Sequence, residues 1–335
     1  MYKPKYNITD YLLFLLNEVT VVEKKIQSST IAPKWEVKFR QDALLESTHA
    51  STSIEGNSLS LKQVSQVLLD RKSIGIKREQ KEVQNYYRSL TELDKLANLD
   101  TITSKNILTI HKQIMTGVML NDSPGKWRQG AVVIGNPRTR AITYVAPAFT
   151  QVPQLIQELL DWYNTGNDYL HPVIKAAIMH YRFVWIHPFM DGNGRTARTM
   201  ATLTLLREKF DQKRFIVLDD YYNANRSLYY VNIQATNKSQ DLTEWLEYFC
   251  EGILLSLQAV NNRIQNLQES SLSNTQQQIL ETIRKKSRIK SADIQALLGI
   301  SKQAVVKKLN SMINQRLIIR RGKGKATYYT LKNNS

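Results

Sequence analysis

Apolar residues recur at helical spacing along most of the chain, and strand-like runs are confined to two short stretches. Residues 173–185 and 196–206 each place apolar side chains three or four positions apart, which is typical of buried helices. A third segment of this kind ends at Ile54, and Gly56 is placed there as a helix C-cap. The pattern therefore predicts a mainly α protein.

Two glycine-containing turns interrupt this helical pattern. Between Gly125 and Pro147, two apolar runs flank a turn at residues 135–140 and predict a β-hairpin. Near the other end of the chain, β-rich runs from Leu317 and Thr327 flank a basic turn and predict a second hairpin. We therefore expect two small β elements in a helical protein, without internal repeats.

Length and composition favour more than one domain. The chain has 335 residues, of which 42% are hydrophobic, enough for a substantial core. We expect a helical N-terminal region over residues 1–97, a core over residues 98–262 and a C-terminal domain over residues 275–333. The polar stretch at residues 263–274 is expected to be a linker between the last two.

Cysteine usage and the N-terminal pattern indicate where the protein works. Cys250 is the only cysteine, so the sequence offers neither an internal disulfide nor a cysteine-based metal site. The apolar run at residues 11–16 is short, lies between Asp10 and Glu18 and lacks a cleavage site, which argues against a signal peptide or a membrane span. We expect a cytoplasmic protein without a membrane partner.

Positive charge is concentrated in the C-terminal part of the chain. Residues 271–335 contain 14 Lys or Arg and only two acidic residues, so they carry +12 of the formal net charge of +17. Their pattern predicts helices at residues 275–286 and 291–298, a turn at Gly299 and a further helix capped by Ser301. This is the order of a helix-turn-helix, and the hairpin that follows resembles the wing of winged-helix DNA-binding domains.

A winged helix would bind DNA through the second helix of the motif and through the wing. The resemblance implies that side chains of that helix face the major groove and that side chains of the wing face the DNA backbone. The former are Lys302, Gln303 and Lys307, and the latter are Arg320, Arg321, Lys323 and Lys325. A solvated basic surface and a protein-docking module are the alternatives.

The string HPFMDGNGRTAR at residues 187–198 carries the most specific chemistry. His187 follows a predicted helix, so its imidazole is expected just past a rigid scaffold. Gly192 and Gly194 permit close backbone approach before the next helix, whose first amides would face an anion. The string therefore predicts a phosphate site with its own base.

Charged side chains complete this predicted phosphate site. Arg195 and Arg198 are three residues apart and would share one face of the first helical turn, where they can contact successive phosphates. Asp191 is an oxygen ligand suited to Mg²⁺ shared with those phosphates. A calcium-binding loop is disfavoured, because Arg195 and Thr202 fall where that loop needs an oxygen ligand and a glutamate.

The string matches the signature of Fic-domain proteins, and the chain resembles this family over about residues 42–250. Members typically transfer AMP from ATP to a protein hydroxyl. The resemblance implies that His187 is the general base and that Asp191 binds Mg²⁺. It also implies phosphate contacts from Gly192, Asn193, Gly194, Arg195 and Arg198. The expected fold is a helical Fic core with a β-hairpin flap and a C-terminal winged-helix domain.

Two further segments extend the resemblance. In Fic proteins the place of the first predicted hairpin belongs to a flap that aligns the target segment by strand addition, so Ile134 and Gly135 would touch nucleotide and target. A purely structural hairpin is the alternative. Tyr229, Tyr230 and Asn237 are similar to residues that cradle adenosine in this family, although aromatic residues at helical positions are also typical of a core.

The segment STSIEGN at residues 51–57 resembles the inhibitory motif of Fic proteins. A carboxylate in the last turn of a helix meets the negative end of the helix dipole, so Glu55 is expected to be solvated or to pair with a cation. The resemblance implies that Glu55 pairs with Arg198 and displaces the γ-phosphate from a productive pose, while Ser51 helps to anchor the helix. An ordinary surface glutamate is the alternative.

Together these features predict a protein adenylyltransferase that uses ATP and Mg²⁺ to modify a Ser, Thr or Tyr hydroxyl of a target protein or of itself. Glu55 would inhibit it from within the same chain. His187 favours this enzyme over a nucleotide-sensing, DNA-binding transcription regulator, which needs no base. A de-AMPylating or bifunctional Fic enzyme stays open as an alternative, as does a homodimer.

Overall fold

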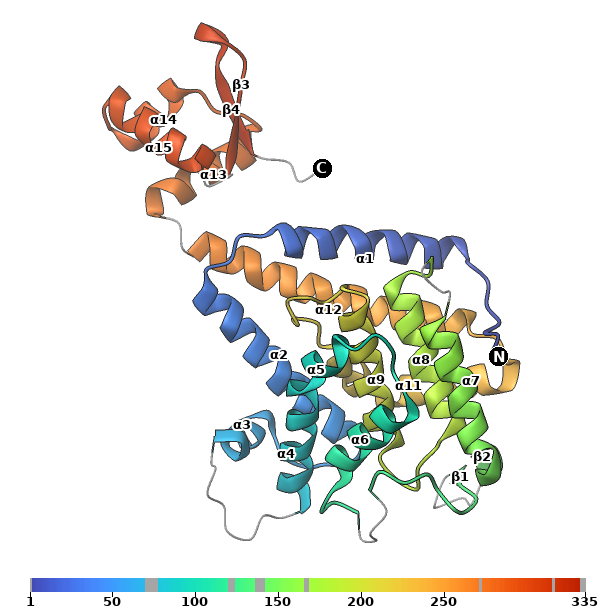
Figure 1. Cartoon of the computed structure of the whole chain (residues 1–335). Coiled ribbons are helices and arrows are strands. Elements are labelled where there is room, and N and C mark those ends of the chain that lie inside the picture. The colour runs from blue at the N-terminus through green and yellow to red at the C-terminus, as the bar shows by residue number, and fades with distance from the viewer. Residues whose placement is uncertain are drawn as a thin grey trace. The chain divides into compact units, whose positions relative to one another are not determined.

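The computed structural model of the chain describes residues 2–69, 78–119, 124–135, 142–165, 169–270, 273–314 and 317–331. The chain divides into two compact units, residues 1–261 and residues 262–335. In the part of the chain that the structure describes, each unit combines helices with one two-stranded hairpin (Figure 1). The prediction of a mainly α fold is confirmed.

The first unit opens with a series of helices and continues through the hairpin into the region of the Fic-like motif. Its N-terminal helices are α1 (Asp10–Ser28), α2 (Pro33–Ile54), α3 (Leu61–Leu69), α4 (Arg78–Thr91), α5 (Leu93–Ala97) and α6 (Ser104–Met115). They are followed by β1 (Val133–Gly135), β2 (Ile142–Val145), α7 (Val152–Asn164), α8 (Pro172–Ile186), α9 (Asn193–Arg207), α10 (Leu218–Ala224), α11 (Arg226–Ser239) and α12 (Thr243–Ser270), of which the last residues belong to the second unit.

Helices α8 and α9 form the buried centre of the first unit. Both bury side chains around most of their circumference, which is typical of a helix enclosed by others, and they pack along each other. α8 ends directly before His187, as the sequence predicts. α9 begins at Asn193, earlier than the predicted start near Thr196, because Gly192 takes φ 80° and forms the N-cap. The motif therefore lies in the turn between two central helices.

Helix α2 brings the segment at residues 51–57 to this centre. Its C-terminal half is buried and packs against α4 and α10. The helix ends at Ile54, so Glu55 is the C-cap residue and not, as the sequence suggested, part of the last turn. Gly56 follows with φ 97°, a left-handed conformation that glycine adopts without the strain of a side chain.

The predicted hairpin between Gly125 and Pro147 is present and short. Val133 pairs with Val145 and Ile134 with Tyr144, and a bulge follows Ile134. The Tyr144 hydroxyl donates a hydrogen bond to the carbonyl of Trp185, near the end of α8. This contact holds the hairpin beside the motif, while the turn predicted at residues 135–140 lies, from residue 136 on, outside the described residues.

The stretch that the sequence predicted as a linker, residues 263–274, is mostly helical. α12 continues to Ser270, and α13 begins at Asn274. Val260 and Ile264 are spaced one helical turn apart and both are buried, so the apolar face of α12 extends into the stretch. Earlier in the helix α12 lies alongside α1 (Figure 1), where Tyr11 donates to Glu251 over 2.6 Å.

The second unit contains the predicted helices and hairpin in the predicted order. They are α13 (Asn274–Lys286), α14 (Ser291–Leu298), α15 (Lys302–Asn314), β3 (Ile318–Arg321) and β4 (Tyr328–Leu331). Ser301 caps α15 by accepting the Ala304 amide over 3.2 Å. A small core made by side chains of all three helices and both strands includes Ile279, Ile294 and Leu309.

None of the described helices combines the length and the apolar character that a bilayer-spanning helix requires.

Candidate active site

His187 occupies the position directly after α8 in a left-handed conformation, with φ 51° and ψ 58°. Such a conformation costs a non-glycine residue about 1 kcal/mol or more, so the surroundings must hold it. Its amide donates to Phe183 over 3.0 Å, and its carbonyl accepts the Nε of buried Arg128 over 2.8 Å. Arg128 also donates to the carbonyls of Gly130 and Pro147, which ties the hairpin region to the start of the motif.

The environment of the His187 ring suits a general base. Its Nδ1 lies 3.3 Å from the carbonyl oxygen of Val184. Because a carbonyl oxygen can only accept, the ring hydrogen belongs on Nδ1, and Nε2 keeps its lone pair. Burial, with a smaller contribution from Arg128, lowers the pKa of His187 to about 4, so the ring is neutral at physiological pH.

The glycine-rich turn of the motif is fixed by its own side chains. Asn193 accepts the Phe189 amide and donates to the Phe189 carbonyl, both over 2.9 Å. Asn193, which is one of the predicted phosphate contacts, therefore uses its side chain to close the turn. His111 accepts the amide of Gly125 at Nδ1, so its Nε2 donates to the Asp191 carbonyl over 2.9 Å.

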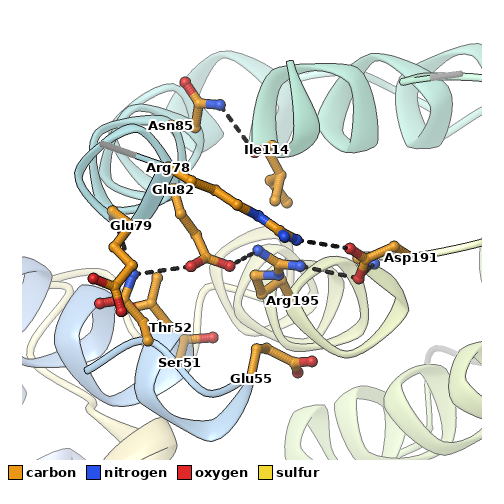
Figure 2. Close-up of polar contacts among 12 residues, drawn as sticks. Ser51, Thr52, Glu55, Arg78, Glu79, Glu82, Asn85, Ile114, Asp191 and Arg195 are labelled. Atoms are coloured by element: carbon orange, nitrogen blue, oxygen red, sulfur yellow. Dashed lines mark hydrogen bonds and ion pairs between the residues drawn. The ribbon is translucent and has the colours of Figure 1, made fainter. Parts of the chain in front are cut away.

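Arg195 lies in the first turn of α9 and is almost completely buried. It donates to Asp191 over 3.1 Å and pairs with Glu82 of α4 (Figure 2). Burial lowers the pKa of the guanidinium to about 10, which still leaves it charged at neutral pH. Its buried Nε has no hydrogen-bond partner among the described residues. An unmatched buried donor of this kind is expected where a ligand binds.

Arg198, one turn further along α9, is buried between α2 and α10. It donates to the hydroxyl of Ser51 over 2.7 Å, to the Ser51 carbonyl over 3.0 Å and to Glu55 over 2.8 Å. Asp219 of α10 lies 3.2 Å from its Nε. Within the described part of the chain, its buried NH1 also lacks a hydrogen-bond partner.

The carboxylate of Glu55 lies at the N-terminus of α9. A Cβ atom placed on Gly194 would lie only 2.3 Å from the Glu55 carboxylate and 3.1 Å from Arg198, so a larger residue there would displace the Glu55 carboxylate. Burial opposes ionisation of Glu55, but the charges of Arg198 and Arg195 outweigh it and keep its pKa below the usual range. The position where a helix N-terminus would bind an anion is therefore next to a protein carboxylate.

Asp191 presents a carboxylate that fits a metal ion shared with phosphates. Its side chain is 43% exposed, receives the amide of Gly192 over 2.5 Å and lies 3.9 Å from Arg78. One accessible carboxylate is the kind of donor with which Mg²⁺ completes a shell otherwise made of phosphate and water oxygens.

The other predicted nucleotide contacts differ in how accessible they are to a ligand. Ile134 and Gly135 end the exposed strand β1. Tyr229 is buried, and its hydroxyl lies 3.2 Å from Nε2 of His180, so its ring is not open to a ligand. Tyr230 is 43% exposed, and Asn237 accepts the hydroxyl of Tyr181 over 2.9 Å. Of the two tyrosines, only Tyr230 retains an accessible ring.

Three residues that sequence reasoning missed complete the site. Glu82 and Asp219 provide carboxylates to the two motif arginines, and Arg128 holds the His187 backbone. Each comes from a segment distant in the sequence, and no motif or spacing marks it. A weak signal exists for Glu82 alone, because it lies on the same face of α4 as buried residues.

The predicted DNA contacts lie on the surface of the second unit. Lys302, Gln303 and Lys307 are exposed on α15 and line an open groove along it, together with Val306, Asn310, Ser311 and Asn314. Arg320 and Arg321 are exposed on β3, and Lys323 is exposed in the following turn. The side chain of Lys325 lies outside the described residues.

This geometry agrees with the comparison to known families. Residues 101–205 match the Fic/DOC family, and the chain therefore contains a Fic/DOC domain. It is 31% identical over 174 residues to a protein adenylyltransferase Fic from Drosophila willistoni and 29% identical over 219 residues to one from Aedes aegypti. These alignments cover 51% and 64% of this chain but 33% and 41% of the relatives, so the chain spans well under half of their length.

Solved structures show the same fold. A Fic family protein from Desulfovibrio desulfuricans G20 superposes with a TM-score of 0.69 over 99% of both chains, at 24% identity. Fic-1 from C. elegans superposes with a TM-score of 0.62 at 25% identity, covering 78% of this chain and 74% of that one.

Proposed function

We propose that the protein transfers AMP from ATP to a hydroxyl group of a protein and that Glu55 restrains this activity. The observation that carries the proposal is the combination of a neutral His187 with two buried arginines, each of which keeps one donor unmatched. The relatives named protein adenylyltransferase Fic support the same reaction.

In the proposed reaction, Nε2 of His187 accepts the proton of the target hydroxyl. The hydroxyl oxygen attacks the α-phosphorus of ATP, a new P–O bond forms, and the bond to the pyrophosphate leaving group breaks. Arg195 and Arg198 bind the β- and γ-phosphates, and the backbone at residues 192–194 faces the phosphate chain. Asp191 would hold Mg²⁺, which neutralises phosphate charge when bound.

The inhibitory role follows from where Glu55 lies. Its carboxylate binds Arg198 over 2.8 Å and lies against Gly194, where a phosphate would need both the arginine and the helix N-terminus. Two anions cannot share these donors without repulsion. We infer that the resting protein binds ATP in a pose that is poorly aligned for transfer. A carboxylate so close to the phosphates could also orient water, so removal of AMP is the second reaction to be measured.

Incubation with α-labelled ATP and Mg²⁺ tests this proposal. We expect Glu55→Gly to increase label on protein by tenfold or more, because removal of one charge–charge contact of this kind is worth about 1.4 kcal/mol or more. Glu55→Gly combined with His187→Ala should show no label. Glu36→Gly, at the opposite end of α2, is the matched control and should label like wild type.

Two results would contradict the proposal. Unchanged labelling in a folded Glu55→Gly protein would remove the inhibitory role of Glu55. Absence of label from every variant, with ATP still bound, would favour a nucleotide sensor. Loss of label from prelabelled protein on adding wild type would reveal the reverse reaction.

We also infer that the second unit is a winged helix that binds DNA. The supporting observation is the exposure of basic side chains on both α15 and β3, in a region that carries most of the net positive charge. A nucleotide-dependent transcription regulator would use the same surface. Binding of a duplex DNA probe by the full chain tests this inference.

A further inference from the structure

Glu82 of α4 connects two parts of the site that are distant in the sequence. One carboxylate oxygen pairs with NH1 of Arg195, and the other accepts Nδ2 of Asn57 over 2.9 Å. Figure 2 shows Glu82 pointing from α4 toward Arg195, with Asp191 on the other side of the guanidinium. Glu82, Asn57 and Arg195 are all buried, so the three groups form a polar network inside the protein.

Asn57 connects this polar network to the turn that contains Glu55. Its Nδ2 also donates to the carbonyl of Glu79 over 3.0 Å, and its amide donates to Thr52 over 3.1 Å. The turn after α2 is therefore attached to α4 two residues beyond Glu55. A movement of the turn backbone that takes Glu55 away from Arg198 would strain or break these contacts.

Burial explains why Arg195 needs a fixed counterion. A buried guanidinium without one would lose much of its charge–charge stabilisation, and its long side chain would have several rotamers to choose from. Asp191 alone is a poor partner, because its side chain is 43% exposed and is the proposed metal ligand. Glu82 fixes the guanidinium through NH1 and leaves Nε unmatched.

We propose that Glu82 is a positioning residue that holds Arg195 ready for the nucleotide phosphates and, through Asn57, holds the turn that places Glu55 on Arg198. This inference rests on the proposed nucleotide chemistry. Glu82 touches no reacting atom and acts only through Arg195 and Asn57.

Calorimetric titration with ATP and Mg²⁺ in the Glu55→Gly protein tests the first half. Glu82→Gln should raise the Kd for ATP by about tenfold, since it removes the charge that orients Arg195. Glu82→Asp should recover part of the affinity because it keeps that charge. Glu79→Gln is the matched control, because Glu79 lies on the same helix but its carboxylate binds Ser58. The Kd of this variant for ATP should equal that of the Glu55→Gly protein.

Labelling with α-labelled ATP tests the second half. Asn57→Ala should increase labelling severalfold while Glu55 is present, because the turn is no longer attached to α4. In the Glu55→Gly background the same substitution should change nothing, which separates a role in restraint from a general loss of structure.

The outcomes distinguish this inference from the proposed function. An unchanged or lower Kd in Glu82→Gln overturns the positioning role, and a lower Kd would mean that Glu82 competes with phosphate. Equal labelling of Asn57→Ala and wild type overturns the link to Glu55. If no variant transfers label but Glu82→Gln still weakens ATP binding, AMP transfer fails and the role of Glu82 toward Arg195 stands. If no variant binds ATP, both fail.

Discussion

Three motif residues, His187, Arg195 and Arg198, each have a charged partner outside the motif. Arg128 holds the His187 carbonyl, and carboxylates of Glu82 and Asp219 accompany the arginines. Arg128 satisfies a buried backbone carbonyl, and the two carboxylates offset the charge of buried guanidinium groups. Burial therefore affects the reactivity of these motif residues as much as residue type does.

The depressed pKa of His187 has a consequence for the pH dependence of labelling. Burial disfavours the protonated ring and moves the pKa from 6.5 to about 4, so the base-competent neutral form persists as the pH falls. We expect labelling by Glu55→Gly to stay level from pH 8 to about pH 5 and to fall only at about pH 4 or below, because this variant lacks the Glu55 charge that raises the pKa of His187. Initial rates across this range, with folding checked by circular dichroism, measure it. A midpoint near 6.5 would show that the ring titrates as if exposed.

The turn between α8 and α9 is the element on which the site depends. Its backbone must reverse from one buried helix into the next, and Gly192 makes this possible with φ 80°. Asn193 closes the turn through two hydrogen bonds to Phe189. A glycine at position 192 therefore has a steric cause as well as the predicted role in phosphate binding.

Gly192→Ala is expected to lower the free energy of unfolding by about 2–4 kcal/mol, from left-handed strain plus overpacking. A Cβ atom there would lie 2.6 Å from the sulfur of buried Met115 and 3.2 Å from Nε2 of His111. Urea denaturation followed by tryptophan fluorescence measures the change. Gly130→Ala is the control, because its Cβ would meet nothing within 4 Å, and a similar loss in both variants would refute the steric explanation.

At the scale of the whole molecule, the chain joins a helical unit that contains the candidate active site to a small basic unit. The two have separate cores, and residues 271–335 carry a formal charge of +12 out of +17. Separate cores allow each unit to bind its own ligand. If the second unit binds DNA as proposed, the candidate active site is carried on the same chain as a DNA-binding unit.

Binding of the full chain to duplex DNA should depend steeply on salt. If about four phosphates are contacted, affinity should fall on the order of a hundredfold between about 50 and 200 mM salt, because counterions are released on binding. Replacing Arg320 and Arg321 together by Gln should reduce the slope of log K against log salt by about 2. Fluorescence anisotropy measures both. Lys285→Gln is the control, since Lys285 pairs with Glu281 on α13, and a flat salt response would point to a protein partner.

The sequence by itself determined the helical class, the places of both hairpins and the central turn. Apolar spacing marks helices wherever one face is buried, and the glycines at residues 192 and 194 mark the turn, where Gly192 takes a left-handed conformation. The pairing of Glu55 with Arg198 and the anchoring by Ser51 also follow the family resemblance and are present in the structure. A motif with several specified positions carries such information because its chemistry needs those residue types together.

Only the tertiary structure decided which side chains are accessible and which carboxylates accompany the arginines. Tyr229 turned inward into the aromatic core while Tyr230 stayed exposed, and α12 continued into the expected linker as far as Ser270. Glu82 and Asp219 lie on helices whose sequences carry no catalytic pattern. Their roles arise because packing brings α4 and α10 within reach of Arg195 and Arg198, and a buried charge finds its partner in whichever segment lies next to it in space.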